Sequence, residues 1–470
     1  MIVLNEQLNE PLYFQIYKQL KDKILLGEFA ENSKLPSTRM LAKTLHVGRN
    51  TVEYAYLQLC SEGYVEGKTG SGFIINKIDT ISYPAFSNQN SPDYIIAPDK
   101  CGKLDYEYNF QYGELNPADF PLKLWRRYTN QVFSSVDIGK MAAYNDRQGE
   151  LGLRIEIMKY LKLSRGVNCQ PEQIVICAGT QSCLFLLCQL FRQYSTIIAF
   201  EDPAYDGARD VFINNGYNVI PIRLEEDGID LVQLEKSQAK IVYITPSHQF
   251  PTGAVLPIRK RINILNWAVQ KDGFIIEDDY DSELRYNSRP IPSVQNLDTK
   301  NRVVYIGTFS KTLAPALRLS YMVLPPTLLE RYQKIFTKYN NPVPWLQQKT
   351  LEYFMSLGHW ERHLRKVCLS QKKKHDILIR TIHELMGTRV TIHGKNAGLH
   401  VLLEFNDKKE HELIDKAKRA GVIVYPVSNY WLRTDKYADN MVLLGFSSLQ
   451  EPDIIKGLKL LKSAWFGNQR

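Results

Sequence analysis

Apolar residues recur at helical spacing near the start of the chain. One series predicts an amphipathic first helix and consists of Leu12, Ile16, Leu20 and Ile24. Ser37, a residue type that caps helices, precedes a second, shorter helix with an expected apolar face of Met40, Leu41 and Leu45. A third helix is expected over 49–61. The glycine-rich alternation over 64–75 predicts a β-hairpin, so residues 1–75 should form a small domain of three helices and a hairpin.

The pattern changes twice after this block. Residues 76–106 lose periodicity and collect prolines and a polar run, so they are predicted to form a linker. From about residue 107 to the end at 470, short apolar runs alternate with helical stretches. This alternation is typical of an α/β fold with a mostly parallel sheet covered by helices.

Six apolar runs have the character of strands buried on both faces: 174–178, 197–200, 241–245, 274–277, 303–307 and 321–324. Helices are expected between them, for instance over 181–192 and 259–270. A single long helix over 346–374 is predicted to lead into a smaller C-terminal α/β unit. The expected strands of that unit are 399–405, 422–425 and 442–446.

Composition narrows the class of protein only slightly. The chain has 470 residues, 44% hydrophobic and 23% charged, as expected for a globular protein of two or three domains. The net charge of +9 suits a polyanionic partner. No stretch approaches the ~20 apolar residues of a membrane span, and the N-terminus does not have the pattern of a signal peptide. The seven cysteines form no Cys-x-x-Cys pair, so we expect reduced thiols in a cytoplasmic protein.

No metal site is expected. His359 and His363 have a helical spacing that zinc can use, but the pattern offers no third ligand. A polar helix face is the favoured interpretation of this pair.

Basic residues are concentrated in one part of the N-terminal block. Its acidic and basic residues are equal in number, yet the stretch 34–52 carries cations and no acid. A helix-turn-helix reads base edges with the first residues of its second helix and holds phosphates with groups nearby. The candidate DNA-binding residues are Arg39, Lys43, Arg49, Asn50, Thr51 and, on the hairpin, Lys68. A protein-interaction module is the alternative, because winged helices also bind proteins.

Lys311 lies just past the predicted strand 303–307, and Arg318 follows seven residues later. A lysine in such a place can form a Schiff base with pyridoxal phosphate (PLP), with the arginine near the phosphate. PLP also requires a carboxylate at its ring nitrogen, a donor to its phenolate oxygen, a stacking ring and a phosphate cradle. Ligands of open α/β sheets bind beyond the carboxyl ends of the strands, so residues at strand ends are the candidates.

Three residues at strand ends suit the PLP ring. Asp278 is the candidate for the ring nitrogen, Tyr280 for the phenolate oxygen and Tyr205 for stacking. A turn between a strand and a helix offers N–H groups to the phosphate through Gly179, Thr180 and Gln181. Each residue alone has an ordinary explanation as a cap, a turn or a core residue, and the set favours PLP because every member lies beside a strand end.

These motifs resemble two known families. LPSTRMLA (35–42), VGRNTV (47–52) and EGYV (62–65) are similar to the winged helix-turn-helix of GntR-type regulators, and residues 109–465 resemble fold-type I aminotransferases. On TPSHQFPTG (245–253), IEDDYDSE (276–283) and GTFSKTLAPALR (307–318), the chain is identified as a member of the MocR/GabR family of PLP-dependent transcriptional regulators.

The resemblance implies that Lys311 is the Schiff-base lysine, and it adds Ser310 and Arg318 to the phosphate contacts. It implies operator contacts from Arg39, Arg49 and Thr51. It also implies a head-to-tail homodimer in which Tyr144 reaches the phosphate of the partner subunit.

The positions expected to bind a substrate carboxylate depart from the family pattern. Phe250 stands where aminotransferases have Asn, and Ser448 stands where a carboxylate-clamping Arg is expected. Gly207 replaces an Arg of the GABA-sensing regulator, and Arg209 is a candidate substitute. The predicted function is a regulator on double-stranded operator DNA that senses a small amine, an amino acid or PLP. An active aminotransferase with an appended DNA-binding module is the alternative.

Overall fold

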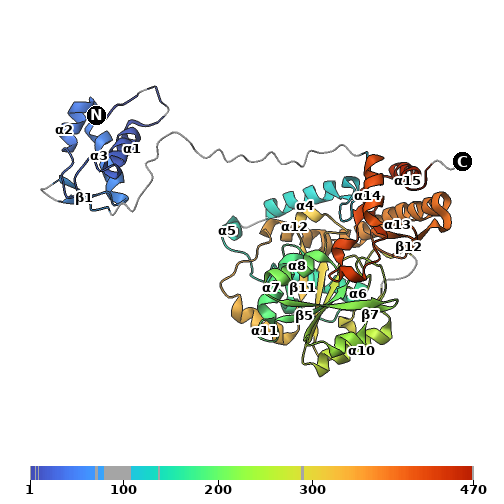
Figure 1. Cartoon of the computed structure of the whole chain (residues 1–470). Helices are drawn as coiled ribbons and strands as arrows, with labels where there is room; N and C mark the ends of the chain where they lie inside the picture. The colour runs from blue at the N-terminus through green and yellow to red at the C-terminus, as the bar shows by residue number, and fades with distance from the viewer. Residues whose placement is uncertain are drawn as a thin grey trace. The chain divides into compact units, whose positions relative to one another are not determined.

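The computed structural model describes residues 2–5, 7–8, 10–68, 72–78, 107–135, 138–286 and 291–467 (Figure 1). The chain divides into two compact units, Met1–Gly102 and Lys103–Arg470. The predicted linker, 76–106, lies outside the described residues except for 76–78.

The N-terminal unit is a winged helix-turn-helix, as predicted. Its elements are α1 (Leu12–Leu25), α2 (Thr38–Leu45), α3 (Arg49–Ser61) and the antiparallel hairpin of β1 (Val65–Lys68) and β2 (Gly72–Ile75). Ser37 caps α2, since its hydroxyl accepts the N–H of Met40 at 3.2 Å. The core includes Ile16 and Tyr56, both fully buried. Met40, expected on the apolar face, is 60% exposed because α2 presents Leu41 and Ala42 to the core instead.

The larger unit is built on an eight-stranded sheet of order β4-β11-β10-β9-β8-β5-β6-β7. The strands are β4 (Ile174–Cys177), β5 (Ile197–Asp202), β6 (Asn218–Glu225), β7 (Gly228–Ile229), β8 (Ile241–Ile244), β9 (Phe274–Asp279), β10 (Val303–Thr308) and β11 (Ser320–Val323). β7 and β11 run antiparallel to their neighbours, and the other strands run parallel to one another. All six strands predicted for this sheet are present; β6 and β7 are additional.

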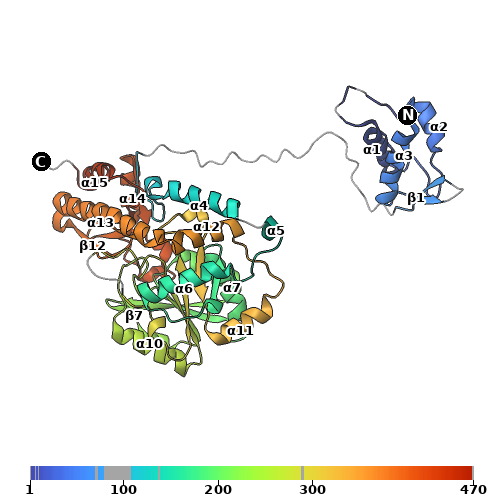
Figure 2. The same ribbon diagram turned by 180° about the vertical axis from the view of Figure 1, so that it is seen from behind.

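Helices cover both faces of this sheet in the two opposite views (Figure 1, Figure 2). Alternate residues of β10 show the reason: Val304 and Ile306 belong to one buried cluster, whereas Val303 and Tyr305 point into clusters on the other face. The helices are α4 (Leu122–Ser135), α5 (Ile138–Met141), α6 (Leu151–Arg165), α7 (Thr180–Phe191), α8 (Asp206–Asn214), α9 (Leu231–Lys236), α10 (Ile258–Gln270), α11 (Pro326–Ile335) and α12 (Trp345–Ser356).

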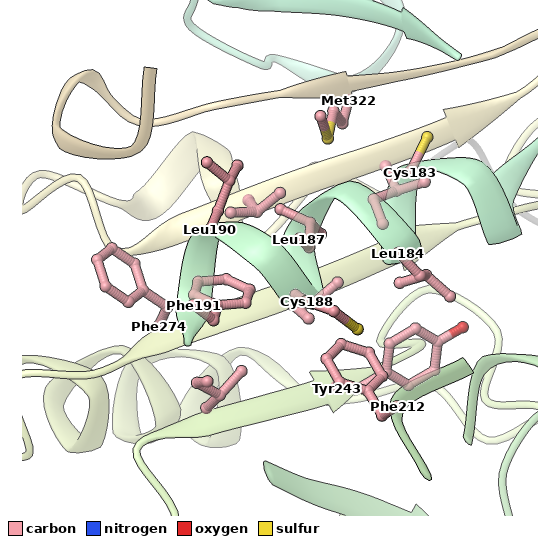
Figure 3. Close-up of a cluster of buried hydrophobic side chains, with 14 of the residues drawn as sticks. Cys183, Leu184, Leu187, Cys188, Leu190, Phe191, Phe212, Tyr243, Phe274 and Met322 are labelled. Carbon is pink, nitrogen blue, oxygen red and sulfur yellow. The ribbon is translucent and has the colours of Figure 1, made fainter. Parts of the chain in front are cut away.

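Helix α7 supplies the most densely apolar of these contacts. Leu184, Leu187 and Phe191 are fully buried, and they lie against side chains of the sheet such as Tyr243 and Phe274 (Figure 3). Because α7 begins directly after β4, this packing fixes the start of the helix at the carboxyl edge of the sheet.

A smaller antiparallel sheet forms the C-terminal part, in the order β12-β13-β16-β15. Its elements are β12 (Val390–His393), β13 (His400–Phe405), β15 (Tyr425–Pro426), β16 (Met441–Gly445) and the helices α13 (His359–Met386), α14 (Glu410–Arg419) and α15 (Glu451–Phe466). β3 (Tyr108–Asn109) pairs in parallel with β14 (Val422–Ile423) beside it. The single helix predicted over 346–374 is wrong: α12 and α13 are separated at Gly358, whose φ of +70° breaks the helix.

A membrane-spanning role finds no support in these elements. Within the described ranges, every helix is too short or too polar to cross a lipid bilayer.

Candidate cofactor and DNA-binding sites

A cavity of about 160 Å³ lies at the carboxyl ends of the parallel strands. Most of the cofactor residues expected from the sequence line it together: Thr180, Gln181, Tyr205, Asp278, Tyr280, Ser310, Lys311 and Arg318. The remaining lining residues are Tyr112, Tyr243, Thr245, Phe250, Thr308 and Pro315. Parallel pairing explains the convergence, because strands β4, β5, β8, β9 and β10 all end at this edge.

Asp278, near the end of β9, has a hydrogen-bond partner at only one of its two carboxylate oxygens among the described residues. Its Oδ2 accepts a hydrogen bond from the hydroxyl of Tyr243 at 2.5 Å. Its Oδ1 is buried and has no hydrogen-bond partner among the described residues. Burial raises the pKa of this carboxyl to about 7, since the charged form is poorly solvated there. A cationic N–H placed in the cavity would satisfy the free oxygen and favour the ionised form.

Lys311 lies in the turn between β10 and β11 and points at an aromatic ring. Its Nζ is 4.0 Å from the ring centroid of Tyr112. Burial lowers the pKa of Lys311 to about 8, although the carboxylates of Asp281 and Asp278 oppose the change. A lysine with a lowered pKa keeps more of its amine neutral, and the neutral amine is the nucleophile.

The turn that carries Lys311 is supported from the far side by α13. The ring Nε2 of His363 lies 2.7 Å from the carbonyl oxygen of Thr312. His363 is buried, so the interpretation of its helix face as polar surface is wrong at this position.

A candidate anion cradle lies where α7 begins, at the edge of the cavity. Gly179 has a φ of +90°, and a Cβ there would stand 2.0 Å from Nη2 of Arg318. The guanidinium therefore lies directly against the first turn of α7. The first N–H groups of a helix lack intrahelical partners and attract anions. Arg318, Ser310, Thr180 and Gln181 together suit a phosphate group.

The two predicted aromatic residues, Tyr205 and Tyr280, also line the cavity. The hydroxyl of Tyr280 donates to the carbonyl oxygen of His248 at 2.9 Å, and the ring Nδ1 of His248 lies 2.8 Å from Asp281. The ring of Tyr205 stands 6.0 Å from that of Phe250 at 84°. Both tyrosines line the cavity, so a planar ring has flanking aromatic groups.

Other predicted residues are not brought into the cavity. Tyr144 is 86% exposed and lies outside the lining of its own chain. Arg209 does not line the cavity; it donates to the carbonyl oxygen of Asn429 at 3.1 Å. Ser448 lies beyond β16, where its carbonyl accepts from Asn116. The fully buried residue of β16 in the aromatic cluster beside the cavity is Leu443.

Sequence reasoning missed two tyrosines that line the cavity. Tyr243 holds Asp278 from β8, and a tyrosine within an otherwise aliphatic buried strand is a signal that was present in the sequence. Tyr112 had no such signal. It follows β3, and its segment is fixed by backbone hydrogen bonds of Phe110 with Ile423 of β14 and Gly445 of β16.

The winged helix presents its predicted DNA-binding residues on its surface. Arg39, Lys43, Arg49 and Asn50 are exposed and Thr51 is partly exposed. Arg49 is the first residue of α3, where a recognition helix enters a groove. Lys68, on the hairpin, is exposed and lies 3.4 Å from Glu66.

Comparison with known proteins agrees with the fold of both units. A family model described as "Bacterial regulatory proteins, gntR family" matches residues 12–75, and one described as "Aminotransferase class I and II" matches residues 109–436. The crystal structure of Pyrococcus horikoshii kynurenine aminotransferase covers 78% of this chain, with 93% of its own length aligned, a TM-score of 0.71 and 24% identity. The chain therefore consists of a GntR-type DNA-binding domain followed by an aminotransferase class I and II domain, which has a PLP-binding fold.

Similarity over the full length identifies the family. The chain is 39% identical over 465 residues to "Uncharacterized HTH-type transcriptional regulator YdeL" of Bacillus subtilis, covering 98% of each chain. It is 30% identical over 480 residues to "Probable rhizopine catabolism regulatory protein MocR" of Rhizobium meliloti, covering 99% of this chain and 96% of that protein. The chain belongs to the MocR family of helix-turn-helix transcriptional regulators, which confirms the resemblance identified from its motifs.

Proposed function

We propose that the aminotransferase-like domain binds PLP at Lys311, and that a small amino compound, or PLP itself, then changes how the winged helix binds operator DNA. The unpartnered Oδ1 of Asp278 carries this proposal. It lines one cavity together with a lysine of lowered pKa and an arginine at a helix N-terminus. No ordinary structural role requires these three groups together.

Different residues of the cavity would bind different parts of PLP. Lys311 would hold the cofactor covalently, and Asp278 would keep a proton on the ring nitrogen. Arg318, Ser310 and the N–H groups at Gly179, Thr180 and Gln181 would bind the phosphate, and Tyr205 and Tyr280 would hold the ring. When bound, PLP supplies an aldehyde carbon that forms a C=N bond with a primary amine.

Regulation requires a difference in affinity between two arrangements of the protein. A ligand shifts such an equilibrium only as far as it binds one arrangement more tightly. We place this equilibrium in a homodimer, with residues 76–106 as the linker between each winged helix and the aminotransferase-like domain.

The cofactor is tested by titrating the full-length apo protein with PLP and following its absorbance. We expect a saturable band in the wild type that borohydride fixes to the peptide containing Lys311. Lys311→Ala should lose the covalent band. Absence of the band from the wild type would refute PLP binding at this site.

The DNA site is tested on a duplex selected by the protein from a random-sequence library. We expect Arg49→Ala to weaken binding by about ten- to a hundredfold, the range of a good bidentate base contact, and to leave the PLP band unchanged. Lys18→Ala is the matched control, because it removes an equal charge from an exposed position on α1. Equal losses in both variants would indicate a general charge effect.

A second function, sensing of PLP alone, is favoured by one observation. Among the residues described around the cavity, Lys311 and Arg318 are the only cations, so a carboxylate substrate has no guanidinium apart from the one assigned to phosphate. A change in DNA affinity on adding PLP without any amine would support this function. Steady turnover of an amino acid would instead support an active aminotransferase.

A further inference from the structure

One wall of the cavity is built from aromatic rings. Tyr112 and Phe250 lie with centroids 5.3 Å apart, and Tyr430 meets Phe250 edge-on at 4.9 Å. Leu443 and Val427, both buried, back these rings in one apolar cluster. Tyr112 also faces Lys311, so this wall borders the amine that reacts.

A buried histidine packs against this wall. His400 packs edge-on against Tyr112 at 4.8 Å, and its Nε2 lies 2.9 Å from the carbonyl oxygen of Pro251. That nitrogen must donate to a carbonyl, so Nδ1 carries the lone pair. Nδ1 is buried with no partner in the described part of the chain. Burial also lowers the pKa of His400 to about 3, which keeps the ring neutral.

Among the residues described around the cavity, Arg318 is the only one with a guanidinium group. Arg318 lies against the start of α7, and Arg209 is bound to Asn429 outside the lining. A carboxylate brought against the aromatic wall would lose its hydration. An uncompensated buried carboxylate is strongly unfavourable, whereas an ammonium group is attracted to aromatic faces.

We propose that the effector that reacts at Lys311 is a primary amine with an aromatic or alkyl body and no carboxylate, selected by Tyr112 and Phe250. This inference rests on the proposed function, because it needs PLP bound at Lys311.

The exchange is balanced without any further reactant. The nitrogen of the incoming neutral amine forms a C=N bond to the aldehyde carbon of PLP as the C=N bond to Lys311 breaks. The two protons of that amine pass to Nζ of Lys311, which leaves as a primary amine. No oxidation or reduction occurs.

A matched pair of ligands tests the inference. 2-Phenylethylamine and L-phenylalanine share one skeleton and differ by the carboxylate. Each is titrated into the PLP-loaded full-length protein, and the shift of the cofactor absorbance and the affinity for the selected duplex are followed. We expect 2-phenylethylamine to produce the shift at a concentration at least about tenfold lower than L-phenylalanine, and to change DNA affinity.

Variants of the wall identify what selects the amine. Tyr112→Leu should weaken the response to 2-phenylethylamine about tenfold, the upper range of a contact between two aromatic rings, whereas Tyr112→Phe should retain most of it. Leu443→Arg places a guanidinium on the strand behind Phe250 and should improve the response to L-phenylalanine relative to the amine. Far-ultraviolet circular dichroism checks the folding of each variant, and Phe250→Asn provides a second test of the wall if Leu443→Arg does not fold.

The outcomes separate this inference from the proposed function. A PLP-loaded protein that responds equally or better to L-phenylalanine, or to neither ligand, overturns the amine class and leaves PLP binding intact. A wild type that does not form the Lys311-linked band overturns both.

Discussion

At the residue scale, the proposed role of Asp278 depends on a charged carboxylate at this position. Tyr243 satisfies one of its oxygens, and burial raises the pKa of the carboxyl to about 7. We expect Asp278→Asn to lower PLP affinity by about ten- to a hundredfold, because an amide cannot carry the charge that pairs with a protonated ring. Titration of the apo protein, followed by absorbance, measures the loss.

Asp415→Asn is the control for this substitution, since Asp415 is exposed on α14. It removes an equal charge from the same domain and should leave PLP affinity unchanged. If Asp278→Asn bound PLP as tightly as the wild type, Asp278 would not be the partner of the PLP ring nitrogen.

The lowered pKa of Lys311 predicts a specific pH dependence. Only the neutral amine attacks an aldehyde, and Lys311 with a pKa of about 8 is neutral in about one molecule in ten near pH 7. An ordinary lysine, with a pKa of about 10.4, is neutral in roughly one in a few thousand. The rate of PLP capture by the apo protein should therefore rise with pH and level off above about pH 8, as stopped-flow absorbance can measure. A rate still rising steeply near pH 10 would contradict the shift.

A residue of the cavity could be predicted when its neighbours in the sequence place it there. Lys311 and Asp278 were found because each follows a buried strand, and the parallel sheet brings such ends together. Tyr112 was missed because it reaches the cavity only through contacts between Phe110 and residues more than three hundred positions later in the chain. The wall that we assign to selectivity is the least local part of the cavity, so the ligand is harder to predict than the cofactor.

At the element scale, the turn between β4 and α7 places the backbone of Gly179 directly against the guanidinium of Arg318. Gly179→Ala adds a methyl group where Arg318 lies, and it also strains a φ of +90°. We expect loss of ~1 kcal/mol of stability and, because Arg318 is displaced, at least a tenfold lower affinity for PLP. Thermal unfolding and the absorbance titration measure the two effects separately.

Gly216→Ala separates strain from displacement. Gly216 has a φ of +78°, and a Cβ there meets nothing within 4 Å. It should lose similar stability and keep wild-type PLP affinity. Equal PLP affinities in the two variants would mean that Arg318 does not bind the phosphate.

Elements were predicted well where burial is uniform and poorly where it is not. The strands of the large sheet with continuous apolar runs were all predicted, since both faces are covered. β6 was missed because all but one of its residues are exposed or only partly buried near the edge of the sheet. The break at Gly358 was missed because a single glycine is compatible with a helix until its positive φ is known.

At the scale of the whole molecule, the two units have different electrostatic tasks. The winged helix has equal numbers of acidic and basic residues, so its attraction to DNA depends on the exposed cations of α2 and the start of α3. The charged side chains of the cavity, Asp278, Lys311 and Arg318, lie close to one another. A ligand bound there would therefore change the electrostatics only locally. Under the proposed function, a signal reaches the winged helix only if ligand binding changes how subunits or units are arranged, which the proposed homodimer would allow.

The exposed Tyr144 gives a direct test of that assembly. It is 86% exposed and does not line the cavity of its own chain, yet the family resemblance assigns it to a phosphate. If it acts on the partner, Tyr144→Phe homodimers should bind PLP about tenfold more weakly, the effect of one hydrogen bond to a charged group. Tyr339→Phe, at another exposed tyrosine, should bind normally.

Mixed dimers decide between action within a chain and action across chains. A dimer of one Tyr144→Phe subunit and one Lys311→Ala subunit contains a single reactive lysine, in the chain that lacks the tyrosine hydroxyl. If Tyr144 acts across the interface, the Lys311→Ala subunit supplies that hydroxyl, and the lone site should recover wild-type PLP affinity. If Tyr144 acts within its own chain, the site stays as weak as in the Tyr144→Phe homodimer. Two affinity tags isolate the mixed dimer, and absorbance titration then shows whether each cofactor site is built from two chains.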